Sequence, residues 1–324
     1  MVRHPPTTAV VVIGRNEGER LVRCLQSLQR TGCPVIYVDS SSTDGSVETA
    51  SAMGARIIRL DLERPFTAAR ARAEGVAELV AHSPPLENVM FIDGDCELEE
   101  GFLDSAERFL LENSEWGAVC GRRRERFPEA SVYNRIIDRE WDTPIGEAEA
   151  CGGDALFRFV AYHDAGGFNP EMIAGEEPEL CARLRSRGWK VMRLDVPMTV
   201  HDAAMYRFSQ WWRRAIRSGM GYAQAWNKTR SQREGRLYVR ELARAIAWAG
   251  VLPSIAIILA VASTPWLLLM WPALVLLQYL RLVRRDGAFS GFLSIAGKYA
   301  ELVGILRYML RSQQQSQQTP VTYK

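Results

Sequence analysis

The sequence predicts an α/β fold in which a doubly wound parallel sheet is followed by an apolar helical region. Short β-branched runs alternate with amphipathic helical patterns between Thr8 and about Gly121. This alternation is typical of a parallel sheet with helices on both faces. A second observation is the uncharged segment from Ala245 to Leu280, and a chain of 324 residues accommodates both parts.

The expected strands are short and rich in β-branched residues. They are TAVVVI from Thr8, VIYV from Val35, RIIRL from Arg56 and VMFI from Val89. Helical spacing over residues 21–28, a helix start near Asp44 and a helix over 68–80 supply the crossovers. The first run leads into polar residues instead of a small-residue cleavage site, so we expect a strand and not a signal peptide.

Polar and acidic residues stand where three of these strands end. In a parallel sheet, ligands bind beyond the carboxyl ends of the strands, so these residues are the first candidates for a site. Carboxylates that crowd together there repel one another unless a positive group lies among them. The residues are Arg15, Asn16, Glu17, Asp39, Asp93 and Asp95.

The Asp93-Gly94-Asp95 motif has three interpretations. A calcium loop fits poorly, because Leu98 and Asp104 stand where glycine and glutamate are required. A phosphoaspartyl enzyme would use Asp93 as its nucleophile. A third interpretation is a site in which Mg²⁺ or Mn²⁺ binds carboxylate oxygens and the oxygens of a diphosphate.

Composition narrows the class of protein further. A formal net charge of +2 does not favour nucleic acid as a partner. The six cysteines include no C-x-x-C pair, so neither a zinc ribbon nor a disulfide framework is predicted. Reduced thiols in the cytosol are the expected state of these side chains.

Seven motifs occur in order between Thr8 and Trp189. They are VVIGRNE, VDSSSTDGS, FTAARARAEG, FIDGDCE, CGGDALFR, GGF and GEEPELCARLRSRGW. Together they resemble the family 2 glycosyltransferases, which are inverting enzymes of the GT-A fold. The resemblance implies a GT-A domain over residues 1–230 that binds a nucleotide-sugar donor together with Mg²⁺ or Mn²⁺.

The resemblance also implies donor-binding and metal-binding residues. Arg15, Asn16, Glu17 and Asp39 would hold the nucleoside, and Arg72 would face the phosphate or sugar, although Ala73 replaces an asparagine common in the family. Asp93 would lie near the ribose or sugar. Asp95 would bind the metal, and His201 stands where related enzymes often supply a second metal ligand. Gln210, Arg213 and Arg214, in a motif similar to Q-x-x-R-W, would close over the diphosphate.

Acceptor and base residues follow from the same resemblance. Gly152, Gly153 and Asp154 would form the acceptor-side loop. Glu177 occupies the position of the usual catalytic aspartate, and its neighbour Glu176 is the alternative base. In an inverting reaction this carboxylate takes the proton of the attacking acceptor hydroxyl.

The uncharged segment predicts a membrane hairpin at about residues 245–283, within a membrane-associated region over 231–311. It is roughly twice the ~20 residues that one membrane helix needs, and Ser263–Pro265 provides a break. Arginines precede and follow it, which places both ends and the catalytic domain on the cytoplasmic side of the inner membrane. The alternative is a buried helical hairpin. Residues 312–324 are expected to be disordered.

These observations predict an inverting glycosyltransferase that moves a sugar from a nucleoside-diphosphate sugar to a saccharide or lipid-linked saccharide acceptor. The product would belong to a cell-surface polysaccharide or glycolipid. Two alternatives stay open. One is a phosphoaspartyl phosphatase that uses Asp93, and the other is a non-catalytic membrane assembly subunit in which Glu177 has replaced the usual aspartate.

Overall fold

The chain forms two compact units, residues 1–205 and 206–324. The structure is a computed structural model that describes residues 8–82, 85–231 and 236–317. Helix α8 (Phe208–Thr229) belongs to the second unit. The sequence analysis placed the boundary near residue 230, after this helix, and that boundary stays a prediction.

A mixed β-sheet forms the centre of the first unit, with strand order β3-β2-β1-β4-β8-β6-β9-β5 and β7 paired to β9. The four strands expected from the sequence are parallel neighbours, as predicted. The sheet is not parallel throughout, because β8 runs antiparallel between β4 and β6. The strands are β1 (Thr8–Gly14), β2 (Val35–Asp39), β3 (Arg56–Arg59), β4 (Asn88–Asp93), β5 (Cys96–Leu98), β6 (Trp116–Glu125), β7 (Gly146–Glu147), β8 (Ala155–Arg158) and β9 (Lys190–His201).

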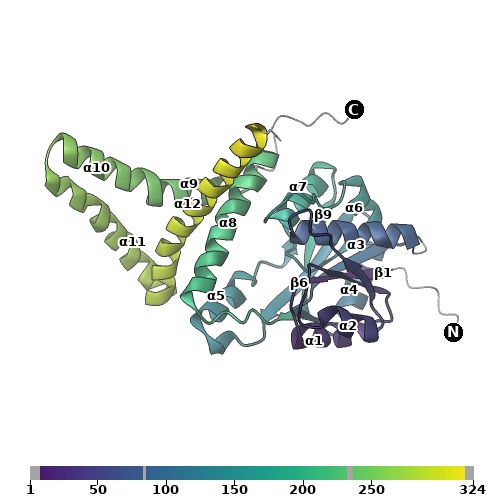
Figure 1. Cartoon of the computed structure of the whole chain (residues 1–324). Coiled ribbons are helices and arrows are strands. Elements are labelled where there is room, and N and C mark those ends of the chain that lie inside the picture. Colours follow the sequence, from purple (N-terminus) through teal and green to yellow (C-terminus); the bar gives the residue numbers. More distant parts are fainter. Residues whose placement is uncertain (1–7, 83–84, 232–235, 318–324) are drawn as a thin grey trace. The chain divides into compact units, whose positions relative to one another are not determined.

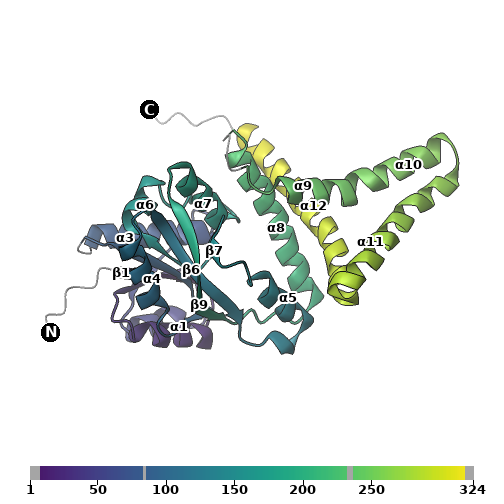
Figure 2. The same cartoon turned by 180° about the vertical axis from the view of Figure 1, so that it is seen from behind.

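Helices cover both faces of this sheet (Figures 1 and 2). The core lies along β1 and β4, whose apolar side chains are buried. Helix α3 packs closely on β1, since a Cβ at Gly75 would lie 2.5 Å from Val11 Cγ1. The helices are α1 (Glu19–Gln29), α2 (Ser46–Ala52), α3 (Ala68–His82), α4 (Phe102–Glu112), α5 (Val132–Glu140), α6 (Phe159–Asp164) and α7 (Glu176–Ser186).

Strand register brings the predicted site residues to one edge of the sheet. Gly14 at the end of β1 pairs with Asp39 of β2 on one side, and Ile13 pairs with Asp93 of β4 on the other. Because the three strands are parallel, the residues that follow them leave the sheet at the same edge. Acidic side chains that are far apart in the sequence therefore meet there.

The second unit is helical and contains three segments long and apolar enough to cross a membrane, namely Val239–Ala262, Pro265–Asp286 and Ala288–Ser312. The first two match the predicted hairpin, and the third lies almost wholly within the membrane-associated region predicted over residues 231–311. Helix α10 (Leu252–Ala262) ends at the predicted break, before η3 (Pro265–Leu269) and α11 (Met270–Asp286). The remaining elements are α9 (Val239–Ile246), η2 (Ala247–Val251) and α12 (Ala288–Gln317).

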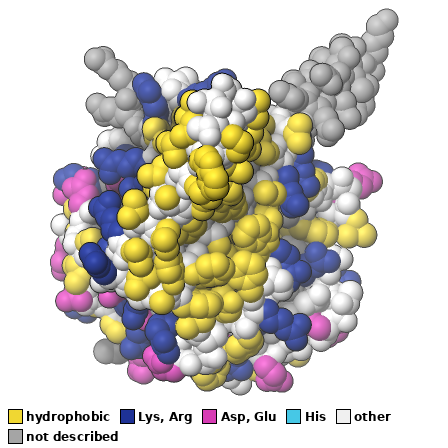
Figure 3. Space-filling model, turned by 90° about the vertical axis from the view of Figure 1, so that its left-hand side faces the viewer, with side chains coloured by type: hydrophobic (Ala, Val, Ile, Leu, Met, Phe, Trp, Pro, Cys, Tyr) yellow, Lys and Arg dark blue, Asp and Glu magenta, His cyan; other side chains and the backbone are white. Residues whose placement is uncertain are grey.

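The hairpin exposes its apolar side chains. Only 11% and 6% of the most apolar windows of the first two segments are buried, which contradicts the alternative of a buried hairpin. Figure 3 shows hydrophobic side chains gathered over this part of the molecule. Helix α12 continues to Gln317, beyond the start of the segment expected to be disordered, and residues 318–324 lie outside the described residues.

Helices α8 and α12 touch backbone to backbone through two glycines. A Cβ at Gly219 of α8 would lie 2.1 Å from Glu301 O, and one at Gly304 of α12 would lie 2.0 Å from Ile216 O. Small residues of this kind let helices approach closely and pack without a strong hydrophobic driving force.

We expect Gly304→Ala to destabilise the helical unit by about 1–3 kcal/mol, because the new methyl group overlaps the carbonyl of Ile216. Gly297→Ala in the same helix is the matched control, since its Cβ would lie 3.6 Å from Trp211. Thermal unfolding of the purified protein in detergent measures the difference. Equal midpoints for the two variants would contradict the close α8–α12 contact.

Candidate active site

Asp93 lies between two arginines at the end of β4. Its Oδ1 is 2.7 Å from Arg72 Nη2 of α3, and its Oδ2 is 3.5 Å from Arg123 Nη2 of β6. Burial raises the pKa of the Asp93 carboxyl, and the two guanidiniums oppose that shift by stabilising its ionised form. Part of the positive charge expected among the carboxylates is thus supplied by the protein itself.

Asp154 is fully buried beneath Asp93 and connects three strands. Its Oδ1 accepts a hydrogen bond from the backbone N–H of Asp93 at 2.9 Å, and its Oδ2 accepts one from Thr199 Oγ1 at 2.8 Å. Arg123 Nη1 lies 3.5 Å from the same Oδ2. These contacts make Asp154 a support of the site, and its predicted contact with the acceptor stays a prediction.

The glycines that precede Asp154 also have a structural explanation. Gly152 adopts a left-handed backbone conformation, with φ of +85°. A Cβ at Gly153 would lie 3.0 Å from Arg72 Nη2 and 3.1 Å from Asp93 Oδ2. The lack of a side chain at Gly153 therefore leaves room for the side chains of Arg72 and Asp93. Its predicted closeness to a sugar stays a prediction.

Asp95 and His201 form the second charged pair. Their Oδ2 and Nε2 atoms are 3.3 Å apart, while His201 Nδ1 lies 3.1 Å from Glu125 Oε2. Burial raises the pKa of Asp95, but the hydrogen bond from His201 and its charge lower it to about 2. Burial lowers the pKa of His201, and its bonds to the two carboxylates more than offset that effect and raise it.

This pair offers a donor set suited to a divalent metal. One carboxylate oxygen and one imidazole nitrogen are ligands that Mn²⁺ accepts, and these atoms lie close enough to share one ion. Glu125, whose side chain is fully buried, holds the other ring nitrogen of His201. A carboxylate in that position fixes the orientation of a metal-binding histidine.

Glu176 and Glu177 begin α7 and point to different surroundings. Glu176 Oε1 lies 2.7 Å from Arg72 Nη1, so this carboxylate shares Arg72 with Asp93. Of the Glu176 side chain, 16% is exposed. Glu177 is 5% exposed. Its Oε1 accepts hydrogen bonds from the Cys151 N–H at 2.6 Å, the Cys151 thiol at 3.1 Å and the Cys181 thiol at 2.9 Å.

Burial raises the pKa of Glu177 although these donors favour its ionised form. Together these hydrogen bonds attach helix α7 to the loop that starts at Cys151. The assignment of Glu177 as the base stays a prediction, but the geometry gives Glu177 a role in holding this loop and leaves Glu176 facing the charged cluster.

The predicted nucleoside-binding residues surround the ends of β1 and β2. Asp39 is buried, and its carboxylate accepts hydrogen bonds from Tyr37 Oη at 3.1 Å and the Ser42 N–H at 2.8 Å. Asn16 Oδ1 accepts one from the Thr43 N–H at 2.7 Å. Arg15 is exposed and stacks over Phe66, while Glu17 pairs with Arg20 at 2.7 Å.

Gln210, Arg213 and Arg214 lie on α8 in the second unit. Gln210 Oε1 accepts hydrogen bonds from the N–H groups of Tyr206 and Arg207 at 2.9 Å, and it caps the start of the helix. The expected contacts of Gln210, Arg213 and Arg214 with a diphosphate stay a prediction.

Sequence reasoning missed Arg123, Glu125 and Trp141. Arg123 stacks on Trp141 at 4.4 Å, and Trp141 meets the His201 ring edge-on at 4.7 Å. A signal was present, because Arg123 and Glu125 alternate in RRRE directly after the buried run WGAVCG, and alternate residues of a strand share one face.

Residues 9–212 match glycosyl transferase family 2, and the chain belongs to this family. Among curated proteins, it is similar to the succinoglycan biosynthesis protein ExoA of Rhizobium meliloti (strain 1021), with 24% identity over 209 residues. The match covers 60% of this chain and 63% of that relative.

The fold is similar to that of the mannosyltransferase PcManGT from Pyrobaculum calidifontis, solved in complex with GDP-Man and Mn²⁺. The TM-score is 0.66 at 19% identity, over 95% of this chain and 88% of that one. Glucosyl-3-phosphoglycerate synthase from Mycobacterium tuberculosis, solved with Mg²⁺ and UDP, gives a TM-score of 0.49 at 19% identity, over 69% and 79% of the two chains. The first comparison confirms the GT-A fold expected from the sequence.

We expect Asp154→Asn to lower the free energy of unfolding by about 3 kcal/mol or more, because it leaves the buried Arg123 without one of its carboxylate partners. The matched control is Asp164→Asn, which breaks an exposed pair with Arg187 and should cost less than about 1 kcal/mol. Urea unfolding followed by tryptophan fluorescence compares the two. Similar losses would argue against a supporting role for Asp154.

Proposed function

We propose that this protein is a metal-dependent, inverting glycosyltransferase that uses a nucleoside-diphosphate sugar. The observation that carries the proposal is the meeting of Asp93, Asp95 and Glu176 at one edge of the sheet, in a chain that belongs to glycosyl transferase family 2. Asp93 is an unsuitable phosphoaspartyl nucleophile, because a guanidinium lies beside each of its oxygens.

The donor binds beyond the carboxyl ends of β1, β2 and β4. Arg15, Asn16, Glu17 and Asp39 surround the nucleoside, as the resemblance implies. Arg72 and Asp93 lie next to the phosphate and sugar, where the guanidinium of Arg72 offers forked donors to oxygen atoms. Gln210, Arg213 and Arg214 complete the diphosphate contacts in this proposal.

Asp95 and His201 would hold Mg²⁺ or Mn²⁺. When bound, the metal neutralises negative charge on the departing nucleoside diphosphate. Glu125 keeps His201 Nε2 directed at Asp95 through its contact with Nδ1. Because metal binding needs the neutral imidazole, it strengthens as the pH rises through the raised pKa of His201.

Glu176 is the base that we propose, in place of Glu177. It takes the proton of the acceptor hydroxyl as that oxygen attacks the anomeric carbon from the side opposite the leaving diphosphate. Glu176 is partly exposed beside Arg72, whereas Glu177 is enclosed by two thiols and the N–H of Cys151.

The acceptor in this proposal is a saccharide or lipid-linked saccharide. Support comes from the name of the relative ExoA, a succinoglycan biosynthesis protein, and from three helices long and apolar enough to cross a membrane. With arginines on both sides of the hairpin, the catalytic unit faces the cytoplasm at the inner membrane.

The decisive experiment incubates the purified protein with UDP-, GDP- and dTDP-sugars and Mn²⁺ or Mg²⁺, and measures nucleoside diphosphate release. We expect one donor to be turned over only when metal is present, and Asp95→Ala to reduce turnover at least about a hundredfold because metal binding is lost. Isothermal titration of Mn²⁺ into both proteins measures the loss of metal binding, and thermal unfolding of both shows whether the variant is folded. Binding of no donor would refute the transferase, and donor binding without turnover would favour the non-catalytic assembly subunit.

Glu176→Gln should lower kcat about 10²–10⁴-fold with little change in donor affinity, because the amide cannot accept the proton. Glu177→Gln is the matched control and should lose far less, since its amide oxygen still accepts the bonds of the Cys151 loop. Steady-state kinetics and donor titration distinguish the variants. A greater kcat loss in Glu177→Gln than in Glu176→Gln would return the base role to Glu177.

A further inference from the structure

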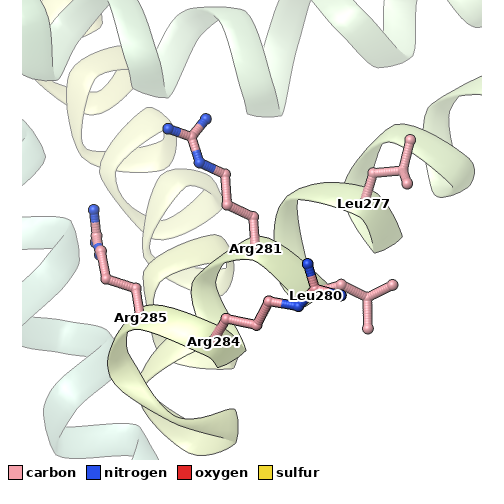
Figure 4. A pocket seen from close by; sticks show the side chains of 5 residues that line it. All are labelled: Leu277, Leu280, Arg281, Arg284 and Arg285. Carbon is pink, nitrogen blue, oxygen red and sulfur yellow. The ribbon is translucent and has the colours of Figure 1, made fainter.

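A hollow of about 410 Å³ lies on the last turns of α11. Leu277, Leu280, Arg281, Arg284 and Arg285 line it (Figure 4). They follow the pattern i, i+3, i+4, i+7 and i+8, which places them along one side of the helix. The hollow therefore combines two apolar side chains with three guanidinium groups.

The positive charge of this hollow is only partly neutralised. Arg285 pairs with Asp286 at 2.7 Å. Within the described part of the chain, neither Arg281 nor Arg284 has a carboxylate within ion-pair distance, and both are exposed. Two or more guanidiniums so arranged present forked donors that fit the oxygens of a phosphate group.

The surroundings of the hollow indicate where that phosphate comes from. Helix α11 belongs to a segment, Pro265–Asp286, that is long and apolar enough to cross a membrane. The three arginines lie in the last turns of this segment. Leu277 and Leu280 are 64% and 48% exposed. A free phosphate ion would leave these leucines in water, whereas a lipid covers them with its first chain carbons.

We propose that this hollow binds the headgroup of an anionic membrane phospholipid. The phosphate lies among Arg281, Arg284 and Arg285, and the start of an acyl chain lies against Leu277 and Leu280. Basic residues at the end of a membrane helix attract anionic headgroups. This lipid is bound and not consumed, so the site is separate from the proposed sugar transfer.

The test titrates the full-length protein in detergent micelles with phosphatidylglycerol or phosphatidylcholine and counts bound lipids by native mass spectrometry. We expect phosphatidylglycerol to bind at least about tenfold more tightly. The triple variant Arg281→Gln, Arg284→Gln, Arg285→Gln should lose this preference. The matched control Arg64→Gln, Arg108→Gln, Arg139→Gln removes three exposed arginines that lie outside the membrane segments and should retain it.

Three outcomes would overturn the proposal. They are equal binding of the two lipids by the native protein, an unchanged preference in the α11 variant, and an equal loss in both triple variants. A further arm adds inorganic phosphate in excess and should leave phosphatidylglycerol bound. Displacement by phosphate would identify a free-phosphate site instead of a lipid site. Thermal unfolding in the same detergent confirms that the variants are folded.

Discussion

The ion pairs of Asp93 with Arg72 and Arg123 are the interactions on which the rest of the first unit's site depends. They connect α3, β4 and β6, and through Arg123 and Asp154 they reach β8. Both arginines have nearly buried side chains, so each needs a carboxylate partner to offset the cost of leaving water. The position of Asp93 is therefore set by the packing of the sheet, independently of any ligand.

The charge balance around this cluster explains why a divalent cation still fits. In the ion pairs of the described residues, Asp93, Asp95, Glu125, Asp154 and Glu176 share two guanidiniums and one imidazole as partners. The edge of the sheet is thus net negative even when His201 is protonated. A diphosphate would be repelled from such an edge unless a cation accompanied it. The arginines hold the carboxylates in place, and in the proposed function a metal ion would make the site acceptable to the donor.

The sequence allowed the β-α alternation and the acidic strand ends to be predicted, because both depend on local patterns. The antiparallel placement of β8 was not predictable in this way, since it depends on pairing with β4 and β6 across the sheet. The alternation of Arg123 and Glu125 indicates a shared strand face, but the residues that they contact depend on the same pairing across the sheet. The contact between Glu125 and His201 joins residues 76 positions apart, through the pairing of β6 with β9.

The two glutamates at the start of α7 show how helix geometry divides roles between neighbours. Successive side chains of an α-helix are turned by about 100°, so adjacent residues point in different directions. Glu176 faces Arg72, and Glu177 faces Cys151 and Cys181. A motif position identifies the pair but does not say which member faces the site. Here the thiols and the N–H of Cys151 engage Glu177, and this leaves Glu176 as the carboxylate beside Arg72 and Asp93.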